Sequence, residues 1–322
     1  MMRMKRVGVV AIGALVTVGA MMGVMGGARV LAQGGALIAK PTKKIYNPPY
    51  LNKDVKPFKI VGNVYYVGLT NFAAFLVSTP QGLILIDTMD HEWVPKLKKS
   101  VTDLGFKLSD IKIILQAHAH VDHVGGLAEL KKETGATVYV MAEDASVLAD
   151  GGVSDFRNFD GKPLWAPVKA DKLLKDGEKV SLGGVTLTAL LTPAHSKGCT
   201  TWTMDTEDDV SGTKRKYNVV FACSQRLNDG VHLTNNPKYP NYAADFAKGF
   251  AKLKTLKPDV WVASHAFMFD LEGKLAKMKP GAANPFIDRE GFQQYVKDYE
   301  HEYQFSLQEE KAGRPATSTT RR

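Results

Sequence analysis

Cysteine is scarce in this sequence, because Cys199 and Cys223 are the only two among 322 residues. Two cysteines exclude a scaffold held together by many disulfides. A strong excess of one charge is also absent: the formal net charge is +9, and the lysine-rich runs at residues 96–99 and after residue 247 are short and scattered. Such runs are typical of solvated helix faces, so they favour a globular protein without a nucleic-acid groove. The sequence also shows no internal repeat.

Long hydrophobic runs are absent except at the N-terminus. Three basic residues precede an apolar run over residues 7–25, and Val30 and Ala32 follow it at positions suited to a signal peptidase. This pattern predicts a secretory signal peptide over residues 1–32 and export to the periplasm. Because the run approaches the ~20 residues that span a bilayer, an uncleaved membrane anchor is the alternative.

The rest of the chain is predicted to form one domain. Residues 33–57 are rich in glycine, proline, lysine and asparagine and indicate an irregular arm, and residues 311–322 indicate a flexible tail. Between them, residues 58–310 show no composition change that would mark a domain boundary. We therefore expect residues 58–310 to carry the function as a single catalytic domain.

Strand patterns occur in two series within this domain. Short β-branched runs follow one another over residues 58–89 and again over residues 178–224. Helical spacing of apolar residues follows each series, at residues 91–104 and 127–134 in the first half and at residues 242–256 and 287–311 in the second. Two such halves, stacked sheet against sheet with helices outside, give a four-layer α/β arrangement.

The two cysteines fall on strands that we expect to pair. If residues 200–206 and 216–224 form a hairpin, a simple register puts Cys199 nearly opposite Cys223. An exported protein meets oxidising conditions, so a disulfide between them is one expectation and two free thiols are the other.

One segment concentrates metal-binding residues. An apolar strand pattern at residues 111–115 leads into His118, His120, Asp122 and His123. In an extended segment the side chains at i and i+2 point the same way, so the first two histidines can converge on one ion. Imidazole and carboxylate are ligands that Zn(II) accepts. A polar loop with purely structural histidines is the alternative for this segment.

Two further histidines stand where the first motif stands, at the ends of apolar strands. His195 follows the strand pattern at residues 185–191, and His265 ends the run DVWVASH. Loops that converge at one edge of a sheet are the usual ligand sites of layered α/β folds. Taken singly, each of these histidines is more often structural, but together with the first motif they indicate a metal site.

The candidate ligands divide into two sets of three, so we expect two Zn(II) ions per chain. One set leaves a tetrahedral zinc ion an open position for water, and a hydroxide shared with a second ion would complete both sites. Such a centre attracts a substrate that bears a carboxylate. The sets are His118, His120 and His195, and Asp122, His123 and His265.

With these motifs in order, the chain resembles the metallo-β-lactamase superfamily, and most closely the third subclass of class B β-lactamases, whose second zinc takes Asp, His and His. The resemblance covers nearly all of residues 58–310, through segments such as FLVSTPQGLILIDT, HAHVDHVGG, LTPAHSKGCTTWTM and ASHAFMFDL. It implies the αββα metallo-β-lactamase sandwich, with the metal site at one edge. Ala117 and Ala194 are departures, because serine and glycine are commoner there in the family.

The resemblance also implies an activity: attack of a metal-bound hydroxide on the β-lactam ring of penicillins, cephalosporins and carbapenems, which gives antibiotic resistance. Asp122 is then the catalytic residue that orients the nucleophile. Ser224 matches a family serine near the site, and Ser224 and Arg226 are the candidates for binding the substrate carboxylate. If Ser224 faces the metals, alternation along its strand turns Cys223 away.

The same resemblance leaves other activities open. Superfamily thioesterases and lactonases place a metal-bridging Asp after the third histidine, whereas the comparable strand here reads VVFACSQR and has no carboxylate. An exported hydrolase of lactones or thioesters nevertheless remains the alternative, followed by a superfamily ribonuclease and a zinc-dependent binding protein without activity. We expect a small-molecule β-lactam as the partner, no nucleic acid, no membrane once the signal is cleaved, and a monomer.

Overall fold

The computed structural model describes residues 37–41, 52–210 and 213–314. The predicted signal peptide at residues 1–32 therefore lies outside the described residues, as do residues 315–322 of the predicted tail. The described residues from Ile38 onward belong to one compact unit. Among the described residues, no helix combines the length and the apolar content needed to cross a membrane.

Seven strands form the first sheet, in sequence order from β1 to β7. The first four pair antiparallel as a meander, and β4 to β7 pair in parallel. The sequence patterns predicted the first six strands, whereas β7 was not predicted because it is short and mostly exposed. The strands are β1 (Phe58–Val61), β2 (Val64–Tyr66), β3 (Phe75–Thr79), β4 (Gly82–Ile86), β5 (Ile111–Leu115), β6 (Thr137–Met141) and β7 (Lys172–Leu174).

Five strands form the second sheet, in the order β12, β11, β10, β9, β8. The hairpin expected around the two cysteines is present, because Trp202 pairs with Phe221 and the ladder continues outward to Val210 and Thr213. Both strands reach further into the turn than predicted, because polar residues at positions 207–209 and 213–215 keep the ladder although they carry no hydrophobic pattern, and β11 ends at Ala222, two residues before the predicted end. The strands are β8 (Lys179–Leu182), β9 (Val185–Leu191), β10 (Thr200–Val210), β11 (Thr213–Ala222) and β12 (Val260–Ala263).

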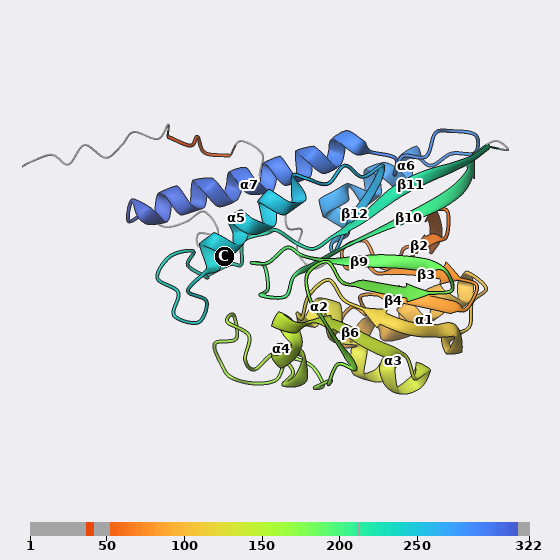
Figure 1. Cartoon of the computed structure of the whole chain (residues 1–322), viewed down its shortest axis with the longest axis horizontal. Coiled ribbons are helices and arrows are strands. Elements are labelled where there is room, and N and C mark those ends of the chain that lie inside the picture. Colours follow the sequence, from red (N-terminus) through yellow and green to blue (C-terminus); the bar gives the residue numbers. More distant parts are fainter. Residues whose placement is uncertain (1–36, 42–51, 211–212, 315–322) are drawn as a thin grey trace, which may run out of the picture. The chain divides into compact units, whose positions relative to one another are not determined.

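Helices cover the outer faces of the two sheets, which gives the four layers visible in Figure 1. The predicted αββα sandwich is therefore confirmed. Helices α1, α3 and α4 lie against the first sheet, and α5, α6 and α7 lie on the side of the second. The helices are α1 (Val94–Asp103), α2 (Val121–Val124), α3 (Leu127–Thr134), α4 (Ala145–Ala149), α5 (Tyr242–Leu253), α6 (Leu271–Lys277) and α7 (Arg289–Lys311).

Alternation along β3 explains why the first sheet is apolar on both faces. Phe75 and Val77 belong to the hydrophobic core between the sheets, whereas Leu76 belongs to the core under α1 and α3. Successive side chains of a strand point to opposite faces, so a strand buried on both sides reads as a continuous apolar run. Each such side chain contributes roughly 1.5–3 kcal/mol when fully buried.

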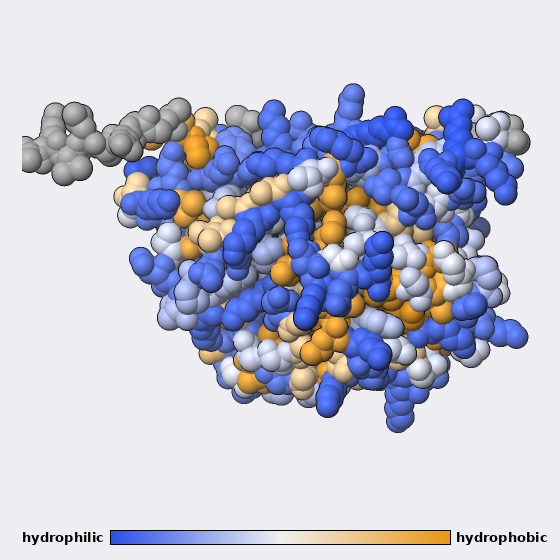
Figure 2. Space-filling model, in the orientation of Figure 1, coloured by the Kyte–Doolittle hydropathy of each residue, from blue (hydrophilic) through white to orange (hydrophobic). Residues whose placement is uncertain are grey.

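The surface shown in Figure 2 is mostly hydrophilic, with hydrophobic residues visible only in small areas. The loop at residues 151–168 packs against both hydrophobic cores. Phe156 and Trp165 are buried in the two cores, whereas Phe159 is 74% exposed. The backbone held by these anchors also carries Arg157 toward the histidines.

Candidate metal centre

The first metal-binding motif follows the end of β5, at one edge of the sandwich. His118 and His120 lie in the turn between β5 and α2, and His120 immediately precedes the helix. Asp122 and His123 are in the first turn of α2, and the helical turn places the ring of His123 beside that of His118. His118 and His123 are fully buried, and His120 is 4% exposed.

The other two histidines come from the second sheet. His195 lies in the loop between β9 and β10, and His265 lies two residues after the end of β12, immediately before a 3₁₀ turn at Ala266–Phe269. Phe72, in the connection between β2 and β3, forms an isolated bridge with His265. The site is therefore built where strand ends of both sheets meet.

The structure brings the six candidate ligands together in the two predicted sets. Within each set, the ligand atoms lie within 4.8 Å of one another. The sets are also adjacent, because the ring centroids of His118 and His123 are 4.1 Å apart. The sets are His118, His120 and His195, and Asp122, His123 and His265.

Buried ring nitrogens test whether this geometry suits a metal. Nε2 of His118 is buried and has no hydrogen-bond partner, and Nε2 of His123 is buried with the Asp122 carboxylate 3.4 Å away. Leaving a buried polar atom unsatisfied is costly, so such atoms need an explanation. A metal ion would satisfy both, and imidazole with carboxylate is a donor set that zinc prefers. The residues therefore fit a zinc centre.

Hydrogen bonds to residues outside the ligand sets determine which ring nitrogen of His195 and of His123 faces the candidate metal centre. Nδ1 of His195 donates to the carbonyl oxygen of Arg226 at 2.7 Å, so its Nε2 is left for the centre. Nδ1 of His123 lies 2.9 Å from Oδ2 of Asp87, whose Oδ1 accepts from the Ala117 backbone at 2.7 Å. Metal-binding histidines commonly hold their second nitrogen in this way. The sequence showed Asp87 only as the end of an apolar strand and did not indicate this role.

Burial and the crowding of charges set the ionisation of the cluster. Burial lowers the pKa of His118 and His195 well below the usual histidine value, and neighbouring cationic groups lower them further. Burial opposes the charge on His123 too, but the carboxylates of Asp122 and Asp87 outweigh it and raise its pKa to about 10. Burial raises the pKa of Asp122, yet His123 and His265 more than offset this and hold it well below its usual range. Asp122 is therefore a carboxylate, and His123 must release a proton to bind a metal.

The two cysteines form a disulfide behind His118. Cys199 and Cys223 are joined with their Cα atoms 5.8 Å apart, and both are fully buried. Sγ of Cys223 lies 3.5 Å from Nδ1 of His118, so the strand does not turn Cys223 away from the site as alternation predicted. The reason is that β11 ends at Ala222, one residue earlier. The bonded sulfurs support the ring of His118 and are not available as ligands.

A cavity of about 140 Å³ opens onto four of the six candidate ligands. Ser224 and Arg226, the predicted substrate-binding residues, line it, and the Arg226 guanidinium pairs with Asp229 at 2.7 Å. A larger groove of about 780 Å³ lies over β8 to β11, but none of the candidate ligands line it. The cavity is lined by His120, Asp122, Arg157, His195, Ser224, Arg226, Asn228, Asp229, His265 and Phe267.

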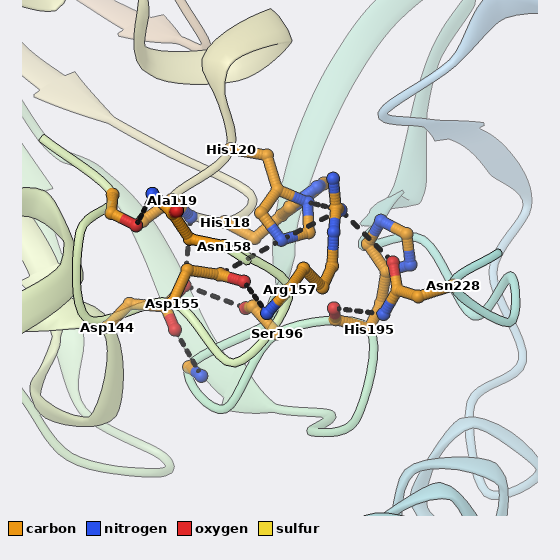
Figure 3. Close-up of polar contacts among 12 residues, drawn as sticks. His118, Ala119, His120, Asp144, Asp155, Arg157, Asn158, His195, Ser196 and Asn228 are labelled. Atoms are coloured by element: carbon orange, nitrogen blue, oxygen red, sulfur yellow. Dashed lines mark hydrogen bonds and ion pairs between the residues drawn. The ribbon is translucent and has the colours of Figure 1, made fainter. Parts of the chain in front are cut away.

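Arg157 is a site residue that the sequence did not reveal. Its Nη1 lies 2.7 Å from Nδ1 of His120 and donates to Oδ1 of Asn228 at 3.1 Å, as Figure 3 shows. Asn228 in turn donates to the carbonyl oxygen of His195 at 2.9 Å. The guanidinium thus lies beside two members of the first ligand set. No motif marks Arg157, because a lone arginine in an irregular loop has no periodic signal.

Ala194, one of the departures from the family pattern, adopts a backbone conformation that favours glycine. Its φ is 120° and its side chain is fully buried. A non-glycine residue in this region is strained by roughly 1–3 kcal/mol. The residue directly before His195 is therefore held in place by its surroundings, including a hydrogen bond from its N–H to the carbonyl oxygen of Ser196 at 2.9 Å.

Comparison with known proteins shows similarity to metallo-beta-lactamases, both in a family model and in solved structures. Residues 68–207 match the family model described as metallo-beta-lactamase superfamily. Native FEZ-1 metallo-beta-lactamase from Legionella gormanii is 40% identical with a TM-score of 0.78, and the match covers 82% of this chain and 99% of that one. Metallo-beta-lactamase GOB-18 from Elizabethkingia meningoseptica is 38% identical with a TM-score of 0.75, over 84% and 99%. BJP-1, a subclass B3 metallo-beta-lactamase of Bradyrhizobium japonicum, is 38% identical with a TM-score of 0.72, over 80% and 96%.

Curated relatives match over a shorter region. A probable metallo-hydrolase, YqgX, of Bacillus subtilis is 30% identical over 126 residues, which are 39% of this chain and 56% of the relative. A hydroxyacylglutathione hydrolase of Rhodopseudomonas palustris is 31% identical over 120 residues, which are 37% of this chain and 34% of the relative. The chain thus spans between a third and just over half of the length of these two relatives.

Proposed function

The chain belongs to the metallo-beta-lactamase superfamily and is a hydrolase, and we propose that it opens the β-lactam ring of penicillins, cephalosporins and carbapenems and so confers antibiotic resistance. The observation that carries the proposal is the pair of three-residue ligand sets at one cavity, the second of them made of Asp122, His123 and His265. The similarity to solved β-lactamases over most of the chain supports the same reaction.

The superfamily implies zinc, and we propose two ions per chain. His118, His120 and His195 would hold one ion, and Asp122, His123 and His265 the other. When bound, zinc supplies Lewis acidity toward the lactam carbonyl and makes water a competent nucleophile near neutral pH. Burial lowers the pKa of His118, so this ring is ready to bind an ion without releasing a proton, whereas His123, with its raised pKa, must release one.

The remaining site residues would bind and orient the substrate. One oxygen of Asp122 lies 3.4 Å from Nε2 of both His123 and His265, and its side chain is 16% exposed at the cavity. This carboxylate can therefore accept a hydrogen bond from an attacking water and orient it. Ser224 and Arg226 line the same cavity, and a guanidinium matches the geometry of the lactam carboxylate. Asp229 holds the Arg226 side chain in position for that contact.

Location and assembly follow from the same proposal. The N-terminal pattern of basic, apolar and small residues supports export to the periplasm, and the buried disulfide suits that oxidising compartment. We propose that the protein acts there as a monomer on a small molecule, without nucleic acid and without membrane attachment after signal cleavage.

Hydrolysis of lactones or thioesters is the second candidate function, and the similarity to a hydroxyacylglutathione hydrolase favours it. The ligand sets do not separate the two activities. The segment after β11, which contains Cys223, Ser224 and Gln225, lacks the aspartate expected of the thioesterase and lactonase branches. This absence of a carboxylate favours the β-lactamase.

A substrate panel tests the proposed function. The purified protein with zinc is expected to hydrolyse benzylpenicillin, nitrocefin and imipenem, and a lactone and a thioester only slowly. Removal of zinc with a chelator should abolish lactam hydrolysis, and added zinc should restore it, because the candidate ligands alone supply no Lewis acid. Turnover of the lactone or thioester without any lactam turnover would establish the second candidate instead.

Replacement of Arg157 is expected to tighten zinc binding. Its guanidinium lies 2.7 Å from Nδ1 of His120. A divalent cation bound to the first set would repel this positive charge, so the guanidinium must move away when the metal binds. Arg157→Ala removes that competition and should lower the dissociation constant about tenfold. Competition with a chromophoric chelator measures the change.

Arg226→Ala is the matched control, because this arginine lines the same cavity but pairs with Asp229. It should change zinc affinity much less and should instead raise the KM for a lactam. Equal zinc affinities of wild type and Arg157→Ala would show that the guanidinium does not compete with the metal.

A further inference from the structure

A buried carboxylate outside the ligand sets connects the two segments that carry the first set. Asp144 ends the 3₁₀ turn Ala142–Asp144 after β6, and it is 1% exposed. Its Oδ2 accepts hydrogen bonds from the backbone N–H of Ala119 at 2.9 Å and from Oγ of Ser196 at 2.7 Å. Its Oδ1 accepts from the backbone N–H of Gly198 at 2.6 Å. Figure 3 shows Asp144 between the two segments.

Two of the three donors adjoin candidate ligands, and the third, Gly198, is three residues beyond His195. Ala119 lies between His118 and His120, and Ser196 directly follows His195. Asp144 therefore ties together the backbones that carry all three members of the first set. Asp87 has a related role for the second set, but it touches the His123 ring itself, whereas Asp144 acts through the neighbouring residues.

The surroundings of Asp144 require a carboxylate. Three donors converge on it, and an ionised carboxylate is the side chain that offers only acceptors. An amide would turn its NH₂ group against one of the donors. Burial raises the pKa of Asp144 to about 6, although the hydrogen bonds from Ala119, Ser196 and Gly198 oppose this rise. A costly buried charge is thus kept at a position that makes no ion pair among the described residues.

The sequence around Gly198 fits the same arrangement. A Cβ atom at position 198 would lie 2.6 Å from Cγ of Asp144, so only glycine allows the carboxylate to approach this backbone. Two positions far apart in the chain, 144 and 198, are therefore matched to make this contact.

We propose that Asp144 is a positioning residue that holds His118, His120 and His195 in the arrangement that binds one metal ion. The inference rests on the proposed function, because it assumes that this set binds zinc. Partners of this kind that act through the ligands typically change metal affinity by about 10–100-fold when they are replaced.

Cobalt titration followed by visible absorption tests the inference, because it reports each ion separately from activity. Wild type is expected to bind two Co(II) ions. Asp144→Asn, which keeps the size of the side chain but replaces an acceptor with a donor, should bind one ion about 10–100-fold more weakly and the other as wild type does. Equal affinities in wild type and Asp144→Asn would overturn the inference.

Asp171→Asn is the matched control. Asp171 also accepts a backbone N–H, that of Val138 at 2.8 Å, and it binds Lys131 at 2.9 Å, but at the opposite end of β6 from Asp144. Its loss should leave both cobalt affinities unchanged. A similar weakening in Asp171→Asn would mean that Asp144 acts only through general stability and would overturn the inference.

Ser196→Ala keeps the test decisive if Asp144→Asn fails to fold. It removes one of the three donors and should lower the affinity for the same cobalt ion by a smaller factor, about threefold to tenfold. No change in this variant would overturn the inference. If wild type itself takes up no cobalt, the proposed function and the inference both fail, whereas tight binding of two ions by every variant refutes the inference alone.

Discussion

His118→Ala and Asp122→Ala are expected to lose lactam hydrolysis on the order of a thousandfold or more while the fold is kept. His118 is a member of the first ligand set, and Asp122 belongs to the second and also lines the cavity. A metal contributes several kcal/mol to the stabilisation of developing charge, and each 1.36 kcal/mol is about a tenfold change in rate. Steady-state kinetics with nitrocefin, together with zinc content, measures the loss.

Two histidines outside the ligand sets provide matched controls. His232 pairs with Glu310, and His301 contacts the carbonyl oxygen of Ala39, both away from the cavity. His232→Ala and His301→Ala should hydrolyse nitrocefin at the wild-type rate. Far-ultraviolet circular dichroism establishes that each variant is folded. Undiminished turnover in either His118→Ala or Asp122→Ala would refute the proposed mechanism.

Removal of the disulfide is expected to lower the free energy of unfolding by about 3 kcal/mol. Cys199 and Cys223 are separated by 24 residues, and the bond restricts the unfolded chain over that length. The bond also joins the start of β10 to the end of β11 behind His118, so its loss should weaken zinc binding as well. Urea unfolding of the oxidised wild type and of the Cys199→Ala, Cys223→Ala double variant measures the difference.

A reducing agent provides the control for the disulfide. A dithiol reductant should lower the stability of the wild type during unfolding and leave the double variant unaffected, because that variant has no bond to reduce. Mass spectrometry of the unreduced protein should find no free thiol. Two free thiols, or equal stability of wild type and double variant, would contradict the prediction.

Most of the fold could be predicted from local hydrophobic patterns in the sequence. Apolar runs such as those of β3, β4 and β5 mark strands that are buried on both faces, and helical spacing marks α1 and α7. These elements follow from nearest-neighbour periodicity, which the sequence displays directly. The short, exposed β7 and the outer part of the β10–β11 hairpin were missed, because backbone pairing rather than an apolar pattern holds them.

The candidate ligands could be named from the sequence because they follow strand ends. His118, His120, Asp122 and His123 stand within six residues, and His195 and His265 each follow an apolar strand. The packing of both sheets then placed all six in two adjacent sets, and four of the six line one cavity. Their roles as zinc ligands remain predictions that the metal and activity measurements above test.

The disulfide, Asp87, Asp144 and Arg157 could be assigned only from the tertiary structure. Sequence alone left Cys199 and Cys223 with two outcomes, because the register of a hairpin decides which residues meet. Asp144 reaches a donor 54 residues away in Gly198, and Arg157 reaches Asn228 across 71 residues. Contacts between residues this far apart produce no periodic sequence pattern, so they cannot be predicted from the sequence alone.

The sequence by itself indicated the metal chemistry proposed for this protein, because donor type and local spacing are properties of neighbouring residues. The tertiary structure decided how the donors are held: which ring nitrogen faces the centre, which carboxylate fixes each loop, and which cation lies beside the first set. These arrangements depend on the packing of two sheets against each other, and packing joins residues that no local pattern relates.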